Sequence, residues 1–159
     1  MKITLPEFPL VGGCICGAIR YSIAAAPVTV YACHCKDCQR SGSGPFSVAL
    51  TVRREHFAVT RGAGTAQLYL KPADSGRKVP QFSCPACSTR LWNEPAHSPE
   101  MIILRAETLD NAAWAVPVGH IWIASRLPWD KSELIGPLFE GQPGDRKLLY
   151  DAWADAIAP

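Results

Sequence analysis

Apolar and polar residues alternate over short stretches of this chain, and glycine or proline interrupts the stretches at intervals of roughly ten residues. Alternation with a period of two, in stretches rich in β-branched and aromatic residues, is typical of strands with one buried face. The pattern predicts strands at Ala18–Ala24, Phe46–Val52, Phe57–Thr60, Thr65–Leu70, Val79–Phe82, Arg90–Trp92, Met101–Arg105 and His120–Ala124. Many short strands at this spacing favour a mainly β fold.

Two stretches have a helical pattern instead. The stronger one is Asp145–Ile157, where apolar residues recur every four positions at Leu149, Trp153 and Ile157. Asp145 is suited to be its N-cap, because a carboxylate oxygen accepts hydrogen bonds from the first free amides of a helix. A single helical turn is expected at Lys36–Arg40. Pro128, Pro137 and Pro143 predict an irregular surface wrap over residues 126–144.

Length and composition exclude several classes of protein. A chain of 159 residues suits one domain with a hydrophobic core, and 48% hydrophobic residues argue against disorder. Only 19% of residues are charged and the net charge is +2, so neither a nucleic-acid partner nor a membrane partner is expected. Apolar runs are too short to span a bilayer, and Pro6 and Pro9 interrupt the N-terminal region, which does not resemble a signal peptide. We therefore expect a cytoplasmic protein.

Seven cysteines in three tight groups carry the candidate chemistry. The groups are Cys14 with Cys16, Cys33 with Cys35 and Cys38, and Cys84 with Cys87. Cysteines stay reduced in the cytoplasm, and an odd number does not form a complete set of internal disulfides. Such short spacing brings thiolates within reach of one metal ion, and tetrahedral zinc takes either four thiolates or three thiolates with one open position.

Spacing alone allows two partitions of these cysteines. In the first, a structural zinc is bound by Cys14, Cys16, Cys84 and Cys87, and a catalytic zinc by Cys33, Cys35 and Cys38. In the second, Cys35 and Cys38 join Cys84 and Cys87 in a ribbon-like site, which leaves Cys14, Cys16 and Cys33 for the other ion. The first is favoured, because a local three-cysteine cluster costs less chain closure.

An open zinc position can bind an incoming thiol and lower its pKa. Residues 40–45, which follow this cluster, are rich in free amides and are expected to form a nest for a carboxylate. Most tryptophans belong to the core or its rim, and one is expected to wall the pocket over the zinc. His34 should point away from a metal shared by its neighbours Cys33 and Cys35, because successive strand residues face opposite sides. His120 is expected in the core or at its rim.

Three ordered motifs resemble those of one known family. They are Gly13-Cys14-Ile15-Cys16-Gly17, then Cys33-His34-Cys35-Lys36-Asp37-Cys38-Gln39-Arg40, then Phe82-Ser83-Cys84-Pro85-Ala86-Cys87. Leu109-Asp110 and Pro117-Val118-Gly119-His120 also fit in order. Together they are similar to the glutathione-dependent formaldehyde-activating enzyme family, which shares its domain with centromere protein V. Two positions depart from the family pattern: Ser88 stands where glycine is usual, and Gln39 where arginine is common.

The resemblance implies a mainly β, Mss4-like zinc-binding fold of short antiparallel strands with a C-terminal helix. It implies one zinc-binding domain over residues 1–159, with a motif core at about 12–129 and a C-terminal wrap and helix at 130–159. It also implies the first partition, with two zinc ions per chain. The family's named reaction joins glutathione and formaldehyde into S-(hydroxymethyl)glutathione and is classed as a carbon–sulfur lyase. The alternative function is a zinc-stabilised module that binds glutathione or a protein without catalysis.

Overall fold

The computed structural model describes residues 2–72, 76 and 78–158, which fall into two compact units. The first unit consists of Met1–Leu5, Val28–Leu50 and Ala113–Pro159. The second consists of Pro6–Pro27 and Thr51–Ala112. Strand β4 (Ser47–Arg53) runs from one unit into the other. Each unit contains one of the cysteine groups.

In the first unit, four strands are hydrogen-bonded in the order β11-β10-β3-β4. The strands besides β4 are β3 (Thr29–Cys33), β10 (His120–Ile121) and β11 (Leu138–Phe139). Strand β10 runs parallel to both β3 and β11. The helices are α1 (Lys36–Gly42), the 3-10 helix η3 (Ile123–Ser125) and α2 (Lys147–Ile157). Helix α1 therefore begins directly after β3.

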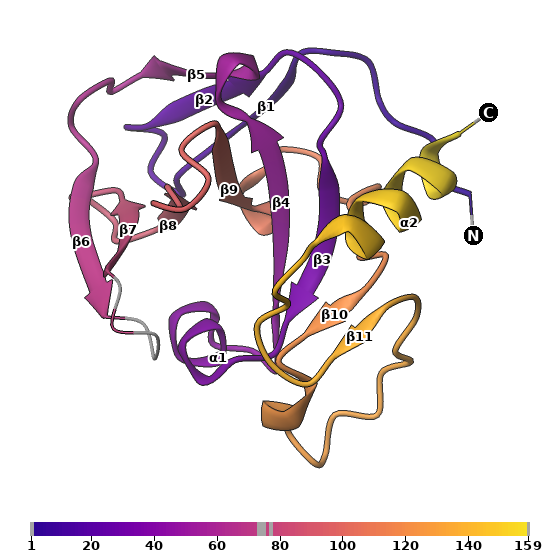
Figure 1. Cartoon of the computed structure of the whole chain (residues 1–159). Helices are drawn as coiled ribbons and strands as arrows, with labels where there is room; N and C mark the ends of the chain where they lie inside the picture. The colour runs from indigo at the N-terminus through magenta and orange to yellow at the C-terminus, as the bar shows by residue number, and fades with distance from the viewer. Residues whose placement is uncertain (1, 73–75, 77, 159) are drawn as a thin grey trace. The chain divides into compact units, whose positions relative to one another are not determined.

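Helix α2 packs against β3 and closes the core of this unit (Figure 1). Leu149 and Trp153 are fully buried on α2, and the Trp153 ring lies 6.3 Å from that of Trp114. The Thr29 hydroxyl donates to the carbonyl oxygen of Leu149 at 3.0 Å. The Ile3 amide donates to the carbonyl oxygen of Ala156 at 2.8 Å, which ties the two ends of the chain together.

The second unit contains a three-stranded antiparallel sheet in the order β1-β2-β5. Its strands are β1 (Leu10–Gly13), β2 (Arg20–Ile23) and β5 (Phe57–Arg61). The remaining strands continue from β4 in the order β9-β8-β7-β6. They are β6 (Gln67–Pro72), β7 (Lys78–Ser83), β8 (Arg90–Asn93) and β9 (Met101–Arg105), and two 3-10 helices, η1 (Arg54–His56) and η2 (Ala106–Thr108), complete the unit.

Aromatic side chains fill the core of the second unit. The ring of Phe57 lies 5.7 Å from that of Tyr21 and 5.3 Å from that of Trp92, and Phe82 stacks on Trp92 at 5.1 Å. The buried Tyr21 hydroxyl and the Thr108 hydroxyl are 2.7 Å apart. This core fixes the turns at which β1 leads to β2 and β7 leads to β8, and these turns contain the cysteine pairs of the unit.

The mainly β fold and the C-terminal helix are confirmed, and each strand predicted from alternation has a counterpart. Strands β1, β3 and β11 were not predicted; β11 lies inside the expected irregular wrap over 126–144. Asp145 is not the N-cap of α2: the structure places Arg146 there, and the Asp145 carboxylate accepts from the Lys147 amide at 2.8 Å. Within the described part of the chain, every helix is too short or too polar to cross a membrane.

Two adjacent leucines of α2 allow a matched test of this packing. Replacing Leu149, which is 0% exposed, with alanine should lower the free energy of unfolding by about 2–5 kcal/mol because it leaves a cavity. Leu148→Ala, at a position that is 59% exposed, should change it by less than about 0.5 kcal/mol. Urea unfolding followed by tryptophan fluorescence measures both. Equal effects would show that α2 does not pack through the face containing Leu149.

Candidate metal centres

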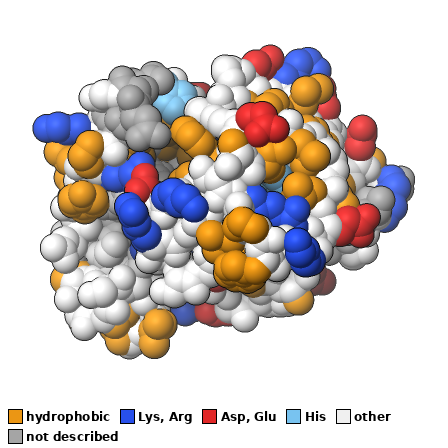
Figure 2. Space-filling model, turned by 90° about the horizontal axis from the view of Figure 1, so that it is seen from below, with side chains coloured by type: hydrophobic (Ala, Val, Ile, Leu, Met, Phe, Trp, Pro, Cys, Tyr) orange, Lys and Arg blue, Asp and Glu red, His pale blue; other side chains and the backbone are white. Residues whose placement is uncertain are grey.

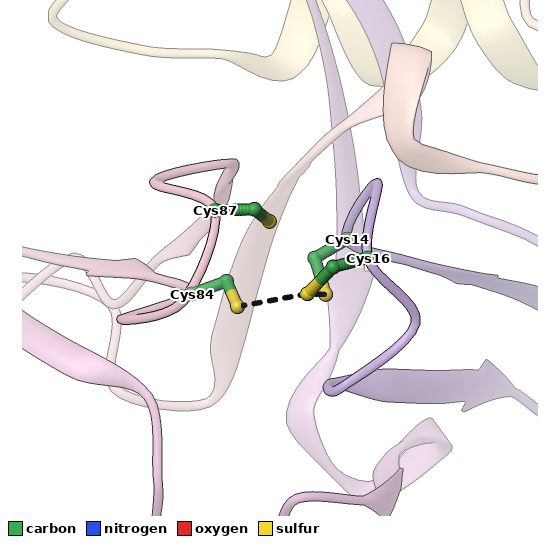
Figure 3. Close-up of side chains that lie close together, drawn as sticks. All are labelled: Cys14, Cys16, Cys84 and Cys87. Atoms are coloured by element: carbon green, nitrogen blue, oxygen red, sulfur yellow. Dashed lines mark hydrogen bonds between the residues drawn. The ribbon is translucent and has the colours of Figure 1, made fainter.

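Two hairpin turns of the second unit bring four cysteines together (Figure 3). Cys14 and Cys16 lie in the turn between β1 and β2, and Cys84 and Cys87 lie in the turn between β7 and β8. In Figure 3 the four thiols point toward one another. All four sulfur atoms lie within 4.8 Å of each other. This is the grouping of the first of the two partitions that the cysteine spacing allowed.

The sulfur geometry fits a tetrahedral ion. Cys16 Sγ lies 3.5 Å from Cys14 Sγ and 3.7 Å from Cys84 Sγ. These separations are far beyond a disulfide bond of about 2.05 Å. Zinc–sulfur bonds of about 2.3 Å at tetrahedral angles place neighbouring sulfurs about 3.8 Å apart. The donor set and its spacing therefore match a four-thiolate site.

Hydrogen bonds in both turns are directed at sulfur. The Ile19 amide donates to Cys14 Sγ at 3.2 Å, and the Thr89 hydroxyl lies 3.1 Å from Cys87 Sγ. Burial raises the pKa of Cys14, but the Ile19 amide and the thiols of Cys16 and Cys84 outweigh it, so the pKa is lowered. The Thr89 hydroxyl and amide lower the pKa of Cys87 to about 5. Both residues are thus prepared to be thiolates, the form that binds metal.

Cys16 shows why this group needs a cation. The Ala18 amide lowers its pKa, but the thiols of Cys14 and Cys87 raise it more, and the pKa is about 12. A thiolate at Cys16 would lie beside other negative sulfurs, and like charges at this distance oppose ionisation. Four thiolates can therefore coexist here only around a positive ion.

Ser88 follows this cluster in a backbone conformation that favours glycine. Its φ is 60°, and its amide donates to the carbonyl oxygen of Cys84 at 2.8 Å. This left-handed conformation accounts for the glycine that the family usually has at this position. The turn keeps its shape with serine, at a cost in backbone strain.

The second cysteine group lies at the junction of β3 and α1 in the first unit. Cys33 ends β3, Cys35 is the N-cap of α1, and Cys38 lies in its first turn. Their three sulfur atoms lie within 4.8 Å of one another, and no fourth His, Cys, Asp or Glu of the described chain joins them. Cys33 is buried, whereas Cys35 and Cys38 are partly exposed. This arrangement leaves one side of the group free of protein ligands.

Electrostatics within the second group resemble those of the first. Hydrogen bonds from the Cys33 and Cys38 thiols, assisted by the Cys38 amide 3.4 Å from Cys35 Sγ, lower the pKa of Cys35 to about 2. The same contacts raise the pKa of Cys33, and burial raises it further. The group alone supports one thiolate, and a second or third requires a positive ion. The alternative partition would take its four ligands from both units, whereas each observed group belongs to one unit.

His34 points away from this group, as its position between two cysteines predicted. It is 0% exposed, and its Nε2 lies 3.0 Å from Nδ1 of the buried His120. The Ile135 amide donates to His120 Nε2 at 3.3 Å, so the neutral His120 ring has its proton on Nδ1 and donates to His34. Burial lowers the pKa of both rings, to about 4 for His120. The pair is neutral at pH 7, and its hydrogen bond joins the cysteine loop to strand β10.

An open pocket of about 420 Å³ lies beside helix α1 in the first unit. It is lined by Gln39, Arg40, Ser43, Gly44, Pro45, Leu127 and Trp129. The pocket joins four residues of the predicted nest at 40–45 with Trp129, but none of the three cysteines lines it, so a tryptophan wall over the metal site stays a prediction. On the face where α1 lies, exposed hydrophobic side chains adjoin lysine and arginine side chains (Figure 2).

Sequence reasoning missed the role of Gln39. Its amide nitrogen donates to the carbonyl oxygen of His34 at 2.8 Å and to that of Ser125 at 2.9 Å. Gln39 therefore joins α1 to the segment that supplies Leu127 and Trp129 to the pocket. No signal in the sequence pointed to residue 125, because the contact joins segments that are far apart in the chain.

The fold and the two thiol groups define a mainly β protein with two candidate metal centres. The sequence model of the family described as "Glutathione-dependent formaldehyde-activating enzyme" matches residues 9–125. Because this match covers more than half of the chain, the protein belongs to that family. The family resemblance seen in the motifs is confirmed.

Two individual proteins are similar to this chain. One, from Halomonas elongata, has a name that assigns it provisionally to glutathione-dependent formaldehyde activation; it is 26% identical over 129 residues, which cover 78% of this chain and 81% of that protein. The other is a Rhodobacter sphaeroides protein of known crystal structure, with a TM-score of 0.54 and 21% identity. That match covers 81% of this chain and 99% of the other, and it shows the fold alone.

Replacing Ser88 with glycine should stabilise the metal-loaded protein. A residue with a β-carbon in the left-handed conformation destabilises the folded state by about 1–2 kcal/mol, and glycine relieves this strain. The greater freedom of glycine in the unfolded chain offsets about 0.5–1 kcal/mol of the gain. We expect a net gain of roughly 0.5 kcal/mol in the free energy of unfolding, measured in urea. Ser83→Gly, within strand β7, is the control and should destabilise. A loss of stability in Ser88→Gly would contradict the strain.

Proposed function

We propose that this protein is a two-zinc carbon–sulfur lyase that joins a thiol such as glutathione to formaldehyde or a related small aldehyde. One observation supports it most directly: three clustered thiols lie at the start of α1, and no His, Cys, Asp or Glu among the described residues joins them as a fourth ligand. Membership of the family supports the same reaction. In this proposal the protein is cytoplasmic and its whole length acts as one domain.

The two cysteine groups have different roles in this proposal. Cys14, Cys16, Cys84 and Cys87 hold a structural zinc that ties two hairpin turns together. Cys33, Cys35 and Cys38 hold a catalytic zinc with one position left for substrate. When bound there, zinc supplies a Lewis acid that lowers the pKa of an incoming thiol and polarises a carbonyl oxygen.

The chain's own residues position the reactants. Cys35 anchors the centre to the N-terminus of α1, where the Cys38 amide donates to its sulfur at 3.4 Å. The pocket between Arg40 and Trp129 offers a cation for a substrate carboxylate and an apolar wall for the rest of the molecule. In the reaction the thiol loses its proton and its sulfur forms a bond to the carbonyl carbon, the carbon–oxygen π bond breaks, and the oxygen takes up the proton that the thiol lost. No oxidant or reductant is required.

The two groups predict different consequences for one chemical change. Cys84→Ser should remove one zinc per chain and lower the free energy of unfolding by several kcal/mol, because metal binding there is coupled to folding. Cys35→Ser should also lower the zinc content from two ions to one but leave the fold near its original stability. Elemental analysis and urea unfolding measure both variants. If the two variants lose stability equally, the ribbon-like partition is the better one.

The reaction itself is tested by exchange kinetics. Because thiols add to aldehydes without an enzyme, the zinc-loaded protein should speed both formation and breakdown of the adduct without moving its equilibrium. Exchange NMR with formaldehyde and a panel of thiols that includes glutathione measures both rates, and Cys35→Ser should return them to background. Unchanged rates for every thiol would refute the lyase. Thiol binding with unchanged rates would identify a binding module instead.

A further inference from the structure

Arg146 is a partly buried cation of the first unit that has no acidic partner. It is the N-cap of α2, its Nη1 donates to the Tyr31 hydroxyl at 3.1 Å, and its guanidinium lies 5.4 Å from the centre of the Tyr31 ring. No carboxylate of the described residues forms an ion pair with it, although Asp145 is its neighbour in the chain. Charged groups removed from water are normally paired. The missing counter-charge of Arg146 therefore needs an explanation.

The alternation of side chains along β3 places Cys33, which can form a thiolate, on the same face as Tyr31, the residue that Arg146 contacts. Tyr31 and Cys33 are two residues apart in β3, so their side chains lie on the same face of the strand. Thr29 belongs to the same row, and its hydroxyl donates to the Leu149 carbonyl, which shows that this face looks at α2. Residues two apart along a strand are separated by roughly 7 Å. The pKa of Arg146 is raised by Tyr31 first, and Cys33 contributes in the same direction.

The net charge of the metal-loaded three-cysteine group makes a nearby cation important. Three thiolates around one divalent ion have a net charge of −1, and a substrate thiolate would make it −2. Such a charge beside the buried Cys33 is costly unless a cation lies near it. The other arginine of this unit that is partly shielded from water, Arg126, already forms an ion pair with Asp130.

We infer that Arg146 is the counter-charge of the three-cysteine centre: it stabilises the metal-loaded, anionic form of Cys33, Cys35 and Cys38 from the α2 side of β3. This rests on the proposed metal centre and assigns a positioning residue that acts through Cys33. Tyr31 fixes the guanidinium in place by its ring and its hydroxyl. The C-terminal segment is then part of the site and not only a cover for the core.

Metal affinity tests this inference separately from the reaction. The protein with its four-cysteine site filled is titrated with Co²⁺ against a competing chelator, and the sulfur-to-cobalt absorption band reports thiolate ligation at the second site. At an effective dielectric constant of about 20, a unit charge within roughly 10 Å of the metal centre corresponds to roughly a tenfold or greater change in affinity. Arg146→Gln should therefore weaken Co²⁺ binding roughly tenfold, whereas Arg146→Lys should stay within about threefold of the natural chain.

The next residue supplies the matched control. Lys147→Gln removes the same charge from a side chain that is 70% exposed and paired with Asp151, and it should leave Co²⁺ affinity unchanged. Should Arg146→Gln fail to fold, Arg146→Met, which keeps the packing on Tyr31 without the charge, takes its place. A folded, uncharged variant with undiminished affinity would overturn the inference. So would Arg146→Lys as weak as Arg146→Gln, because packing and not charge would then be responsible.

These results separate the two proposals. If Co²⁺ affinity responds to Arg146 as expected but adduct exchange stays at background, the counter-charge stands and the lyase does not. If exchange is accelerated while Arg146→Gln binds Co²⁺ normally, the lyase stands and the counter-charge does not.

Discussion

Negative charge concentrated on sulfur is the constraint on which the candidate sites depend. Thiols held 3.5–3.7 Å apart, as in the four-cysteine group, oppose each other's ionisation. The pKa of Cys87 is lowered to about 5 while that of the nearby Cys16 is raised to about 12, so the group is divided between thiolate and thiol without a cation. A positive ion removes this conflict. The geometry of the turns therefore allows four thiolates to share one metal ion.

The two groups differ in the length of chain that a bound ion would close into a loop. Cys16 and Cys84 come from hairpin turns 68 residues apart, so an ion between them closes a long loop and stabilises the second unit. Cys33, Cys35 and Cys38 come from a single strand-to-helix junction, so an ion there closes almost nothing. A site that adds little to folding is free to leave a position open. This difference supports assigning structure to the first group and chemistry to the second.

Local patterns in the sequence predicted the elements whose signals are local. Alternation located β9 at Met101–Arg105 with its observed bounds, and the period of Leu149 and Trp153 located α2. Strand β3 was missed because all five of its residues are buried, so it shows no alternation. Short spacing indicated the three-cysteine group, whereas spacing alone left the partners of Cys14 and Cys16 open between two partitions, and the family resemblance implied Cys84 and Cys87. Contacts between distant segments, such as Gln39 with Ser125 or Tyr31 with Arg146, leave no mark in the sequence.

Strand β3 links these observations, because the residues at its end give the three-cysteine group two different surroundings. His34, the residue directly after β3, contacts His120, and burial lowers the pKa of both rings, so this pair adds no charge beside the cysteines. One face of β3 presents Tyr31 and Cys33 toward α2 and the cation Arg146. A neutral support behind the cysteines and a positive charge beside them suit an anionic metal centre better than a neutral one. The order of residues from Tyr31 to Cys35 thus determines both the ligands and the electrostatics of the site.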